Sequence, residues 1–220
     1  IEMKQVGDVR EKTLLHLQCH FGLSTLSLAR MGALVTGVDF SSDAIEAARR
    51  LSQESGLSAR FVESNIYDIS DNLDEQYDMV FTSYGVLCWL PDLAKWAEQI
   101  VYCLKDGGSF HLVEYHPLMT ALESGLGNDV VLRNSYFNEG VEIFEVEGSY
   151  ASPKSFISET TYEWNHSVGE VVTALVSAGL RIDTFDEYPY ATDGGFVGYL
   201  RRGEDKKWRV PDHKWGVPLT

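Results

Sequence analysis

The sequence lacks several features on which whole classes of protein depend. It has three cysteines (Cys19, Cys88 and Cys103) and no CxxC pair, which is typical of a reducing cytoplasm rather than an export route. Its 18 Lys and Arg against 33 Asp and Glu give a net charge of −15, so a basic groove for nucleic acid is not expected. No stretch approaches the roughly 18 apolar residues of a membrane span, and no His/Cys/Asp cluster has metal-ligand spacing. We therefore expect a cytoplasmic protein that binds no nucleic acid, membrane or metal.

The 220 residues, 44% of them hydrophobic, suit one domain of ordinary size or one domain with an insertion. Short apolar runs predict strands at residues 13–18, 33–38, 59–63, 77–82 and 109–115. Helical spacing and helix end signals predict helices at residues 23–31, at residues 43–55 before Gly56, and from about Pro91 to Leu104. This alternation predicts right-handed crossovers and a parallel sheet covered on both faces.

The alternation breaks after His116-Pro117. We expect extra strands at residues 141–150 and 156–164, a last helix at residues 168–178 and a sixth strand at residues 180–187. The predicted fold class is α/β, an open, doubly wound, mostly parallel sheet with a lid inserted after strand five. Residues 1–116 would form the cofactor-binding half of a single domain and residues 117–165 the lid. Residues 166–220 would supply the C-terminal helix and strands that complete the sheet.

The loops that follow the first two strands carry the clearest chemistry. In open α/β sheets, ligands bind beyond the carboxyl ends of the strands, so residues 18–22 should face a ligand beside the free amides of the next helix. The second strand ends at Asp39, and a carboxylate at that place accepts hydrogen bonds from both hydroxyls of a ribose. Phe40 can lie against a flat base. Alternatively, Asp39 only caps the helix that begins at Ser41-Ser42.

In these segments the chain resembles the class I S-adenosylmethionine-dependent methyltransferases. The resemblance runs through residues 14–25 and 37–41. The family usually has an acidic residue where this chain has His16, and glycines at three positions that here hold Gln18, His20 and Gly22. The likeness continues at residues 77–81 with Gly85-Val86-Leu87, and at residues 104–108, which are similar to the family's L-K-P-G-G turn.

The resemblance implies a site for S-adenosylmethionine. The methionine end would lie along Gln18, Cys19, His20 and Gly22, and its ammonium group would meet carbonyls near Ser83 and Tyr84. Asp39 would bind the ribose, Phe40 would flank the adenine, and Asn65 and the Ile66 amide would bind the adenine edge. Cys19 and His16 can also be explained as residues of the core. Cys19 can be a small buried side chain, and His16 is more often a core histidine than a catalyst.

The methyl acceptor should lie over the ends of strands four and five and under the lid. Five candidate residues occur there: Tyr84, Trp89, Glu114, Tyr115 and His116. Of these, His116 is a possible general base, with an ordinary pKa of about 6.5, or only the turn out of the strand. His166 could face the same pocket or cap the last helix. The lid aromatics could line an acceptor pocket or form the lid's own core; they are Tyr136, Phe137, Phe144, Tyr150, Phe156, Tyr162 and Trp164.

The implied function is methyl transfer to a small-molecule acceptor by a monomer or homodimer. A nicotinamide-binding domain is disfavoured, because its glycines would fall where this chain has Gln18, His20 and Leu23. Side chains there obstruct a pyrophosphate, whereas S-adenosylmethionine carries no phosphate. The altered loop leaves one alternative of another class, a non-catalytic S-adenosylmethionine-binding or regulatory protein of the same fold.

Overall fold

The computed structural model describes residues 6–124, 130–147, 158–192, 198–211 and 217–220. They form two compact units. The first consists of Ile1–Tyr84, Ala94–Val113 and Ala174–Leu180, and the second of Gly85–Leu93, Glu114–Thr173 and Arg181–Thr220. The functional division predicted at residues 116 and 165 stays a prediction.

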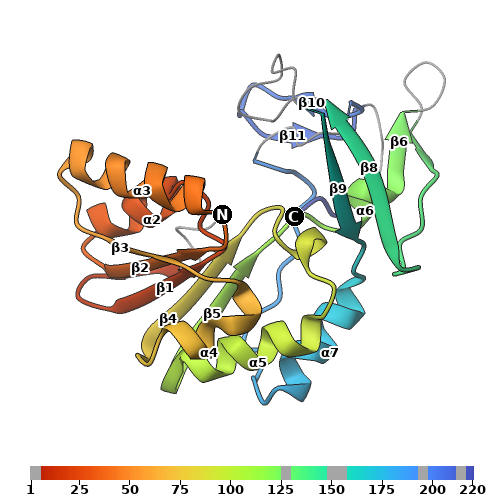
Figure 1. Ribbon diagram of the computed structural model, residues 1–220. Coiled ribbons are helices and arrows are strands. Elements are labelled where there is room, and N and C mark those ends of the chain that lie inside the picture. The colour runs from red at the N-terminus through yellow and green to blue at the C-terminus, as the bar shows by residue number, and fades with distance from the viewer. Residues whose placement is uncertain (1–5, 125–129, 148–157, 193–197, 212–216) are drawn as a thin grey trace. The chain divides into compact units, whose positions relative to one another are not determined.

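The first unit is built on a five-stranded sheet (Figure 1). Its strands are β1 (Thr13–Leu17), β2 (Leu34–Asp39), β3 (Arg60–Glu63), β4 (Tyr77–Ser83) and β5 (Leu104–Val113). They lie in the order β3-β2-β1-β4-β5, and every pairing is parallel. β1 is central, and its residues after Thr13 are buried, as in a sheet covered on both faces. The predicted α/β class, its open parallel sheet and the five strands are confirmed.

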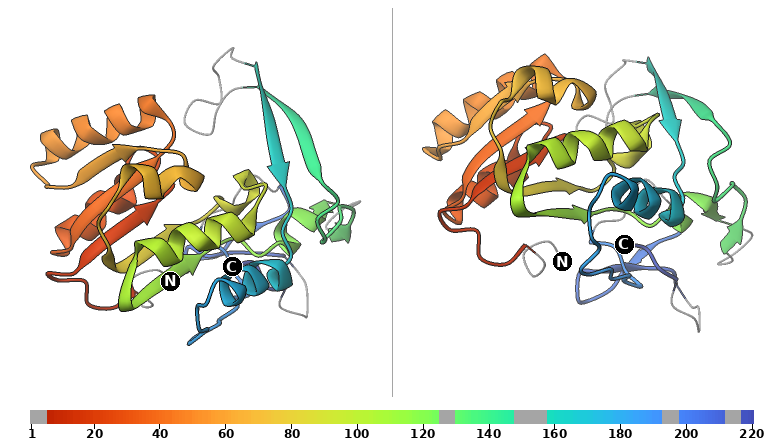
Figure 2. Two further views of the ribbon diagram at one scale, coloured as in Figure 1. Left: turned by 60° about the horizontal axis from the view of Figure 1, so that its bottom comes forward. Right: turned by 90° about the horizontal axis from the view of Figure 1, so that it is seen from below.

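Helices cover both faces of this sheet, as Figures 1 and 2 show. On one face lie α2 (Leu23–Arg30) and α3 (Ser42–Ser55); on the other lie α4 (Ile69–Asn72) and α5 (Leu93–Cys103). The helix ends follow from the sequence. The Ser41 hydroxyl accepts the Ala44 amide at the start of α3, and Gly56 ends the helix with φ 66°. Three residues of α5 on one helical stripe, Trp96, Ala97 and Ile100, are fully buried.

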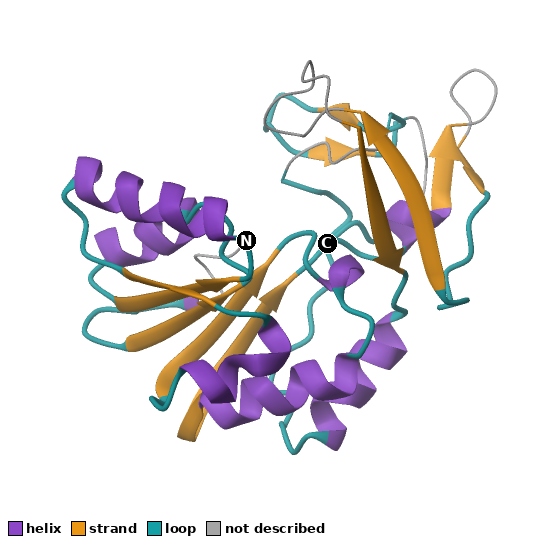
Figure 3. Ribbon diagram, in the orientation of Figure 1, coloured by secondary structure: helices purple, strands orange, loops and turns teal. Residues whose placement is uncertain are grey.

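The second unit contains short antiparallel pairs (Figure 3). These are β6 (Leu122–Ser124) with β7 (Val130–Leu132), β8 (Val141–Glu147) with β9 (Ser158–Trp164), and β10 (Arg201–Arg202) with β11 (Trp208–Arg209). The unit also holds α6 (Leu118–Ala121) and the start of α7 (Val168–Ser177). The two strands expected after residue 117 are thus present as β8 and β9. Their outer ends, with Tyr150 and Phe156, lie outside the described residues, and the lid role stays a prediction.

The predicted sixth strand at residues 180–187 is wrong. The segment contains no strand, and Arg181 to Glu187 are all exposed. The segment has three large apolar residues, Leu180, Ile182 and Phe185. A strand would point Phe185 to the face opposite Leu180 and Ile182, so neither face would carry a continuous apolar surface to bury. The described part of the sheet therefore has five strands.

Candidate functional site

The loop after β1 has the backbone of a glycine-rich loop without most of its glycines. Gln18, His20 and Gly22 have φ values of 52°, 51° and 80°, so all three lie in the left-handed region. For a side chain larger than glycine this conformation costs about 1–2 kcal/mol per residue. These are the three positions at which the resembling family has glycine. In this chain, Gln18 and His20 thus adopt a backbone conformation that glycine adopts most readily.

Gly22 is a position where no other residue fits. A Cβ atom there would lie 2.7 Å from Cε1 of Phe61 and 3.0 Å from Cβ of Ala48. Gly22 is also the N-cap of α2 and offers no side chain to its first turn. The N-cap residue therefore gives the first amides of α2 no side-chain acceptor.

Asp39 joins the loops after β1 and β2. Its Oδ2 accepts the His20 amide at 2.8 Å and its Oδ1 accepts the Ser41 amide at 3.0 Å. The side chain is buried, with 8% of the residue exposed. Two amides fill about half of the four lone-pair positions of a carboxylate. The N-cap of α3 is Ser41, so capping does not account for Asp39. Its remaining lone pairs can accept hydroxyl groups.

The predicted adenine contacts lie at the same edge of the sheet. Phe40 follows Asp39 with 74% of its surface exposed, so its ring is available to a base. The Ser64 amide donates to the Asp39 carbonyl at 2.9 Å, which holds the chain leaving β3 beside the chain leaving β2. Asn65 uses its Oδ1 to cap the Tyr67 amide at 3.0 Å. Ile66 begins the 3-10 helix η1 (Ile66–Asp68), where a first-turn amide has no acceptor within the helix.

Cys19 and His16 are core residues. Cys19 is buried against Leu26 and Ile45, and burial together with the charge of Asp39 raises the pKa of its thiol to about 12. Nδ1 of His16 lies 2.8 Å from the hydroxyl of Thr25, and burial lowers the pKa of the imidazole to about 4. Both side chains thus lie in the core, and a cofactor contact by Cys19 stays a prediction.

At the end of β4, Ser83 and Tyr84 continue the line of strand ends. The Tyr84 amide donates to the Val113 carbonyl at 2.8 Å, and its ring packs against a core cluster that includes Val9 and Phe81. The backbone at this point is thus fixed by β5, as a carbonyl that binds an ammonium group would require. In the first unit, every predicted cofactor residue lies at or just beyond the carboxyl end of a strand.

In the second unit, Glu114 holds the start of the segment that follows β4. Its Oε2 accepts the amides of Val86 at 2.9 Å and Leu87 at 3.1 Å. Its Oε1 accepts the amides of Gly85 and of Tyr115, the latter at 2.8 Å. Burial raises the pKa of the carboxyl, against these four hydrogen bonds, which lower it. Glu114 was expected to line the acceptor site, and its role as an anchor was missed.

Both ring nitrogens of His116 are occupied. Nδ1 accepts the Leu118 amide at 3.2 Å, which assigns the proton to Nε2, and Nε2 lies 2.9 Å from Oε1 of Glu187. Burial lowers the pKa of the ring, although the Glu187 charge opposes this. These contacts are those expected of a residue that stabilises the turn after β5. The general-base role stays a prediction.

His166 is also held in place. Its Nε2 lies 2.7 Å from the Leu90 carbonyl, so this nitrogen carries the proton. The cap of α7 is the next residue, Ser167, whose amide and hydroxyl both donate to Oε2 of Glu170 at 2.8 Å. This capping box has the local signature S-x-x-E and could have been found in the sequence. Catalysis by His166 stays a prediction.

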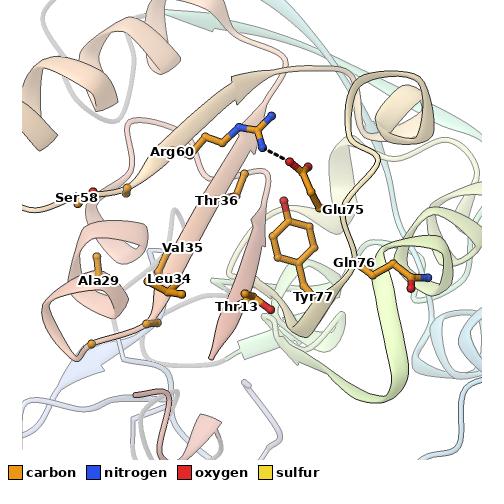
Figure 4. A pocket seen from close by; sticks show the side chains of 13 residues that line it. Thr13, Ala29, Leu34, Val35, Thr36, Ser58, Arg60, Glu75, Gln76 and Tyr77 are labelled. Carbon is orange, nitrogen blue, oxygen red and sulfur yellow. Dashed lines mark hydrogen bonds and ion pairs between the residues drawn. The ribbon is translucent and has the colours of Figure 1, made fainter. Parts of the chain in front are cut away.

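A hollow of about 560 Å³ lies at the opposite edge of the first unit's sheet. It borders the amino-terminal ends of β2, β3 and β4, where Figure 4 shows Arg60 paired with Glu75 near Thr36 and Tyr77. It is thus not the predicted ligand site, which follows the carboxyl ends. Within the described ranges, no three His, Cys, Asp or Glu side chains gather as ligands for a metal ion. Among the helices described, none is long and apolar enough to cross a membrane.

The sheet order, the left-handed loop and the acid at the end of β2 define an α/β domain of the nucleoside-binding type. The sequence profile of a family described as a methyltransferase domain matches residues 15–110. A ubiquinone biosynthesis O-methyltransferase from Serratia proteamaculans (strain 568) is 29% identical over 106 residues, which are 48% of this chain and 44% of that protein. The chain thus spans less than half the length of this relative.

Two solved structures extend the comparison to the fold. A protein from Listeria monocytogenes, described as an S-adenosylmethionine-dependent methyltransferase, matches with a TM-score of 0.67 and 25% identity over 86% of each chain. An S-adenosylmethionine-dependent methyltransferase from Mesorhizobium loti matches with a TM-score of 0.61 and 19% identity, over 83% of this chain and 80% of that one. Residues 15–110 are thus similar to a methyltransferase domain, and the chain shares the fold of these S-adenosylmethionine-dependent methyltransferases.

Proposed function

We propose that the protein transfers a methyl group from S-adenosylmethionine to a small-molecule acceptor. One observation carries the proposal: the left-handed loop at Gln18–Gly22 is tied to a carboxylate, Asp39, that keeps acceptor capacity free. A ribose with two hydroxyls suits that capacity, and a phosphate does not, since it would meet the charge of Asp39. The matches to methyltransferases support the same cofactor.

In this proposal each loop binds one part of the cofactor. The loop after β1 would hold the methionine end, and the ammonium group would meet backbone carbonyls near Ser83 and Tyr84. Asp39 would accept the ribose hydroxyls, and the exposed ring of Phe40 would lie against the adenine. The Ile66 amide would donate to the adenine edge, while Asn65 keeps its cap on Tyr67.

The reaction itself is a direct displacement at the methyl carbon. The acceptor atom attacks in line with the carbon–sulfur bond, the methyl group passes to it, and the bonding pair stays on sulfur. Most of the acceleration can come from orienting the reactants, and a base is needed only where the acceptor carries a proton. His116 and His166 are the proposed candidates for such a base. Each would first have to release a hydrogen bond, to Glu187 or to the Leu90 carbonyl.

The acceptor is proposed to be a small molecule, and an oxygen acceptor is the first class to screen, because the Serratia relative is named as an O-methyltransferase. The acidic charge of −15 argues against a nucleic-acid acceptor. We also propose a cytoplasmic location, on the free state of the three cysteines.

The proposal is tested by calorimetric titration of the chain with S-adenosylhomocysteine, with NAD as the control ligand. Micromolar binding of S-adenosylhomocysteine without NAD binding is the expected result. The catalytic step is then tested with labelled S-adenosylmethionine and a panel of phenols, catechols and primary amines. Binding without transfer to any acceptor class would favour the non-catalytic alternative. Failure to bind S-adenosylhomocysteine would contradict both functions.

A further inference from the structure

The segment that follows β4 is held by side chains at both of its ends. Four backbone amides converge on the carboxylate of Glu114: those of Gly85, Val86 and Leu87, and that of its neighbour Tyr115. The donors Gly85 to Leu87 lie 27 to 29 positions away along the chain. Two oxygens offer about four lone-pair positions, so the four amides fill the acceptor capacity of the side chain.

The far end of the same segment is fixed by a second buried group. Nε2 of His166 donates to the Leu90 carbonyl at 2.7 Å, from 76 positions away. Between the two ends, the thiol of Cys88 donates to the Gly85 carbonyl at 3.6 Å. The 3-10 helix η2 (Leu87–Trp89) closes the turn, and Trp89 presents 46% of its surface. Both ends of the segment are therefore held by side chains that are distant in the sequence, Glu114 and His166.

We propose that Glu114 is a positioning residue that holds the segment 85–90 in the conformation needed for methyl transfer. The proposal rests on the proposed function, in which the acceptor lies beyond the ends of β4 and β5, because Gly85 directly follows the first of these ends and Glu114 the second. Glu114 acts through the backbone of the segment. It has no lone pair left for a ligand, so it does not touch the acceptor or the cofactor.

A glutamine tests this assignment because it keeps the size of the side chain and changes its hydrogen-bonding pattern. One carboxylate oxygen becomes an NH₂ group, which faces two amide donors and cannot accept from them. Glu170→Gln is the matched control. Glu170 is also a carboxylate of the second unit that accepts a backbone amide, but its partner is Ser167 at the start of α7.

Trp89 reports the conformation of segment 85–90. Its resonance is observed by fluorine NMR of the full chain labelled with 5-fluorotryptophan. Five tryptophans give five expected resonances, and Trp89→Phe assigns the one that matters. In Glu114→Gln the Trp89 resonance should shift or split, while Glu170→Gln should leave it in place. Methyl transfer to the best acceptor of the phenol, catechol and amine panel should slow at least about tenfold, the effect of one lost charged hydrogen bond. The dissociation constant for S-adenosylhomocysteine should stay unchanged.

A folded Glu114→Gln chain with an unmoved Trp89 resonance would overturn the assignment. If this variant does not fold, Glu114→Asp replaces it, because the shorter carboxylate keeps the charge but cannot reach all four amides. The same shift of Trp89 is then expected, and its absence contradicts the proposal. If the wild-type chain does not bind S-adenosylhomocysteine, the proposed function is contradicted. The Trp89 resonance tests only the Glu114 assignment, so the two failures can be told apart.

Discussion

Asp39 and Glu114 both lie at the end of a strand and both accept hydrogen bonds from backbone amides, but they differ in how many they accept. Asp39 ends β2 and accepts two backbone amides, those of His20 and Ser41. Glu114 follows β5 and accepts four, three of them from residues 85–87. A carboxylate has about four lone-pair positions, so backbone amides occupy half of the acceptor capacity of Asp39 and all of that of Glu114. The difference separates a side chain that can still bind a ligand from one that only holds the backbone.

The histidines of the two units show a parallel contrast. His16 in the first unit is buried with a neutral partner, the Thr25 hydroxyl. His116 in the second unit lies against a carboxylate, that of Glu187. A nearby negative charge favours the protonated ring, whereas burial alone disfavours it. The two units should therefore respond differently to acid.

The largest effect is expected from Glu114→Ala. The variant leaves four backbone amides without their acceptor, and each such loss is costly where water does not replace it. We expect the free energy of unfolding to fall by about 3–5 kcal/mol, measured by urea denaturation. In Ser41→Ala, which removes the cap of α3, the expected loss is only about 1 kcal/mol. Equal losses in the two variants would mean that Glu114 is no special anchor.

Acid should destabilise the chain through His16. Its pKa is about 4 in the folded chain and 6.5 in the unfolded chain, so between these values only the unfolded chain binds the proton. The stabilisation is complete above pH 6.5, and about 3 kcal/mol of it is lost by pH 4. In His16→Asn this loss should vanish from the pH dependence of urea denaturation. In His116→Asn the dependence should change less, because the Glu187 charge opposes the shift. The same change in both variants would remove the contrast between the two histidines.

Asp39→Ala should weaken cofactor binding, whereas Glu114 variants should leave it unchanged. We expect the binding of S-adenosylhomocysteine to weaken by about 1–3 kcal/mol, the value of a lost charged hydrogen bond, as measured by calorimetry. Ser41→Ala is the control here too, because it disturbs the start of α3 and leaves the carboxylate in place. Unchanged affinity in Asp39→Ala would show that the free lone pairs of Asp39 do not serve the ribose.

Much of the fold follows from local patterns, and the parts that do not have identifiable causes. Apolar runs predict β1 to β4 within one residue at each end. β5 begins at Leu104, five residues before its predicted start, because the charged and glycine residues at 105–108 carry no apolar signal. The prediction of a sixth strand was wrong because Leu180, Ile182 and Phe185 do not all fall on one face of a strand. The capping box at Ser167 and Glu170 was local and could have been predicted.

The anchoring role of Glu114 could not be predicted in the same way. Its partners at residues 85–87 become neighbours only when β4 and β5 pair in the sheet. The left-handed path at Gln18 and His20 likewise does not follow from local propensity, since positive φ is uncommon for any residue other than glycine. Only the likeness to a glycine-bearing family pointed to that path. The place of Asp39 at the end of β2, by contrast, was predictable from the local pattern, and its ribose role stays a prediction.

His20→Gly gives the smallest effect and tests what the loop beside Asp39 requires. Glycine adopts φ 51° without strain but gives the unfolded chain more freedom, so we expect a net stabilisation of about 0.5–1 kcal/mol in urea denaturation. Glu11→Gly is the matched control, with φ 62° at an exposed position outside the loop, and should gain as much. The affinity for S-adenosylhomocysteine should change less than about threefold (under 1 kcal/mol), because the His20 amide still donates to Asp39. If the folded variant loses more affinity than this, the imidazole itself binds the cofactor. The loop would then depend on its new side chain as well as on the backbone that Asp39 holds.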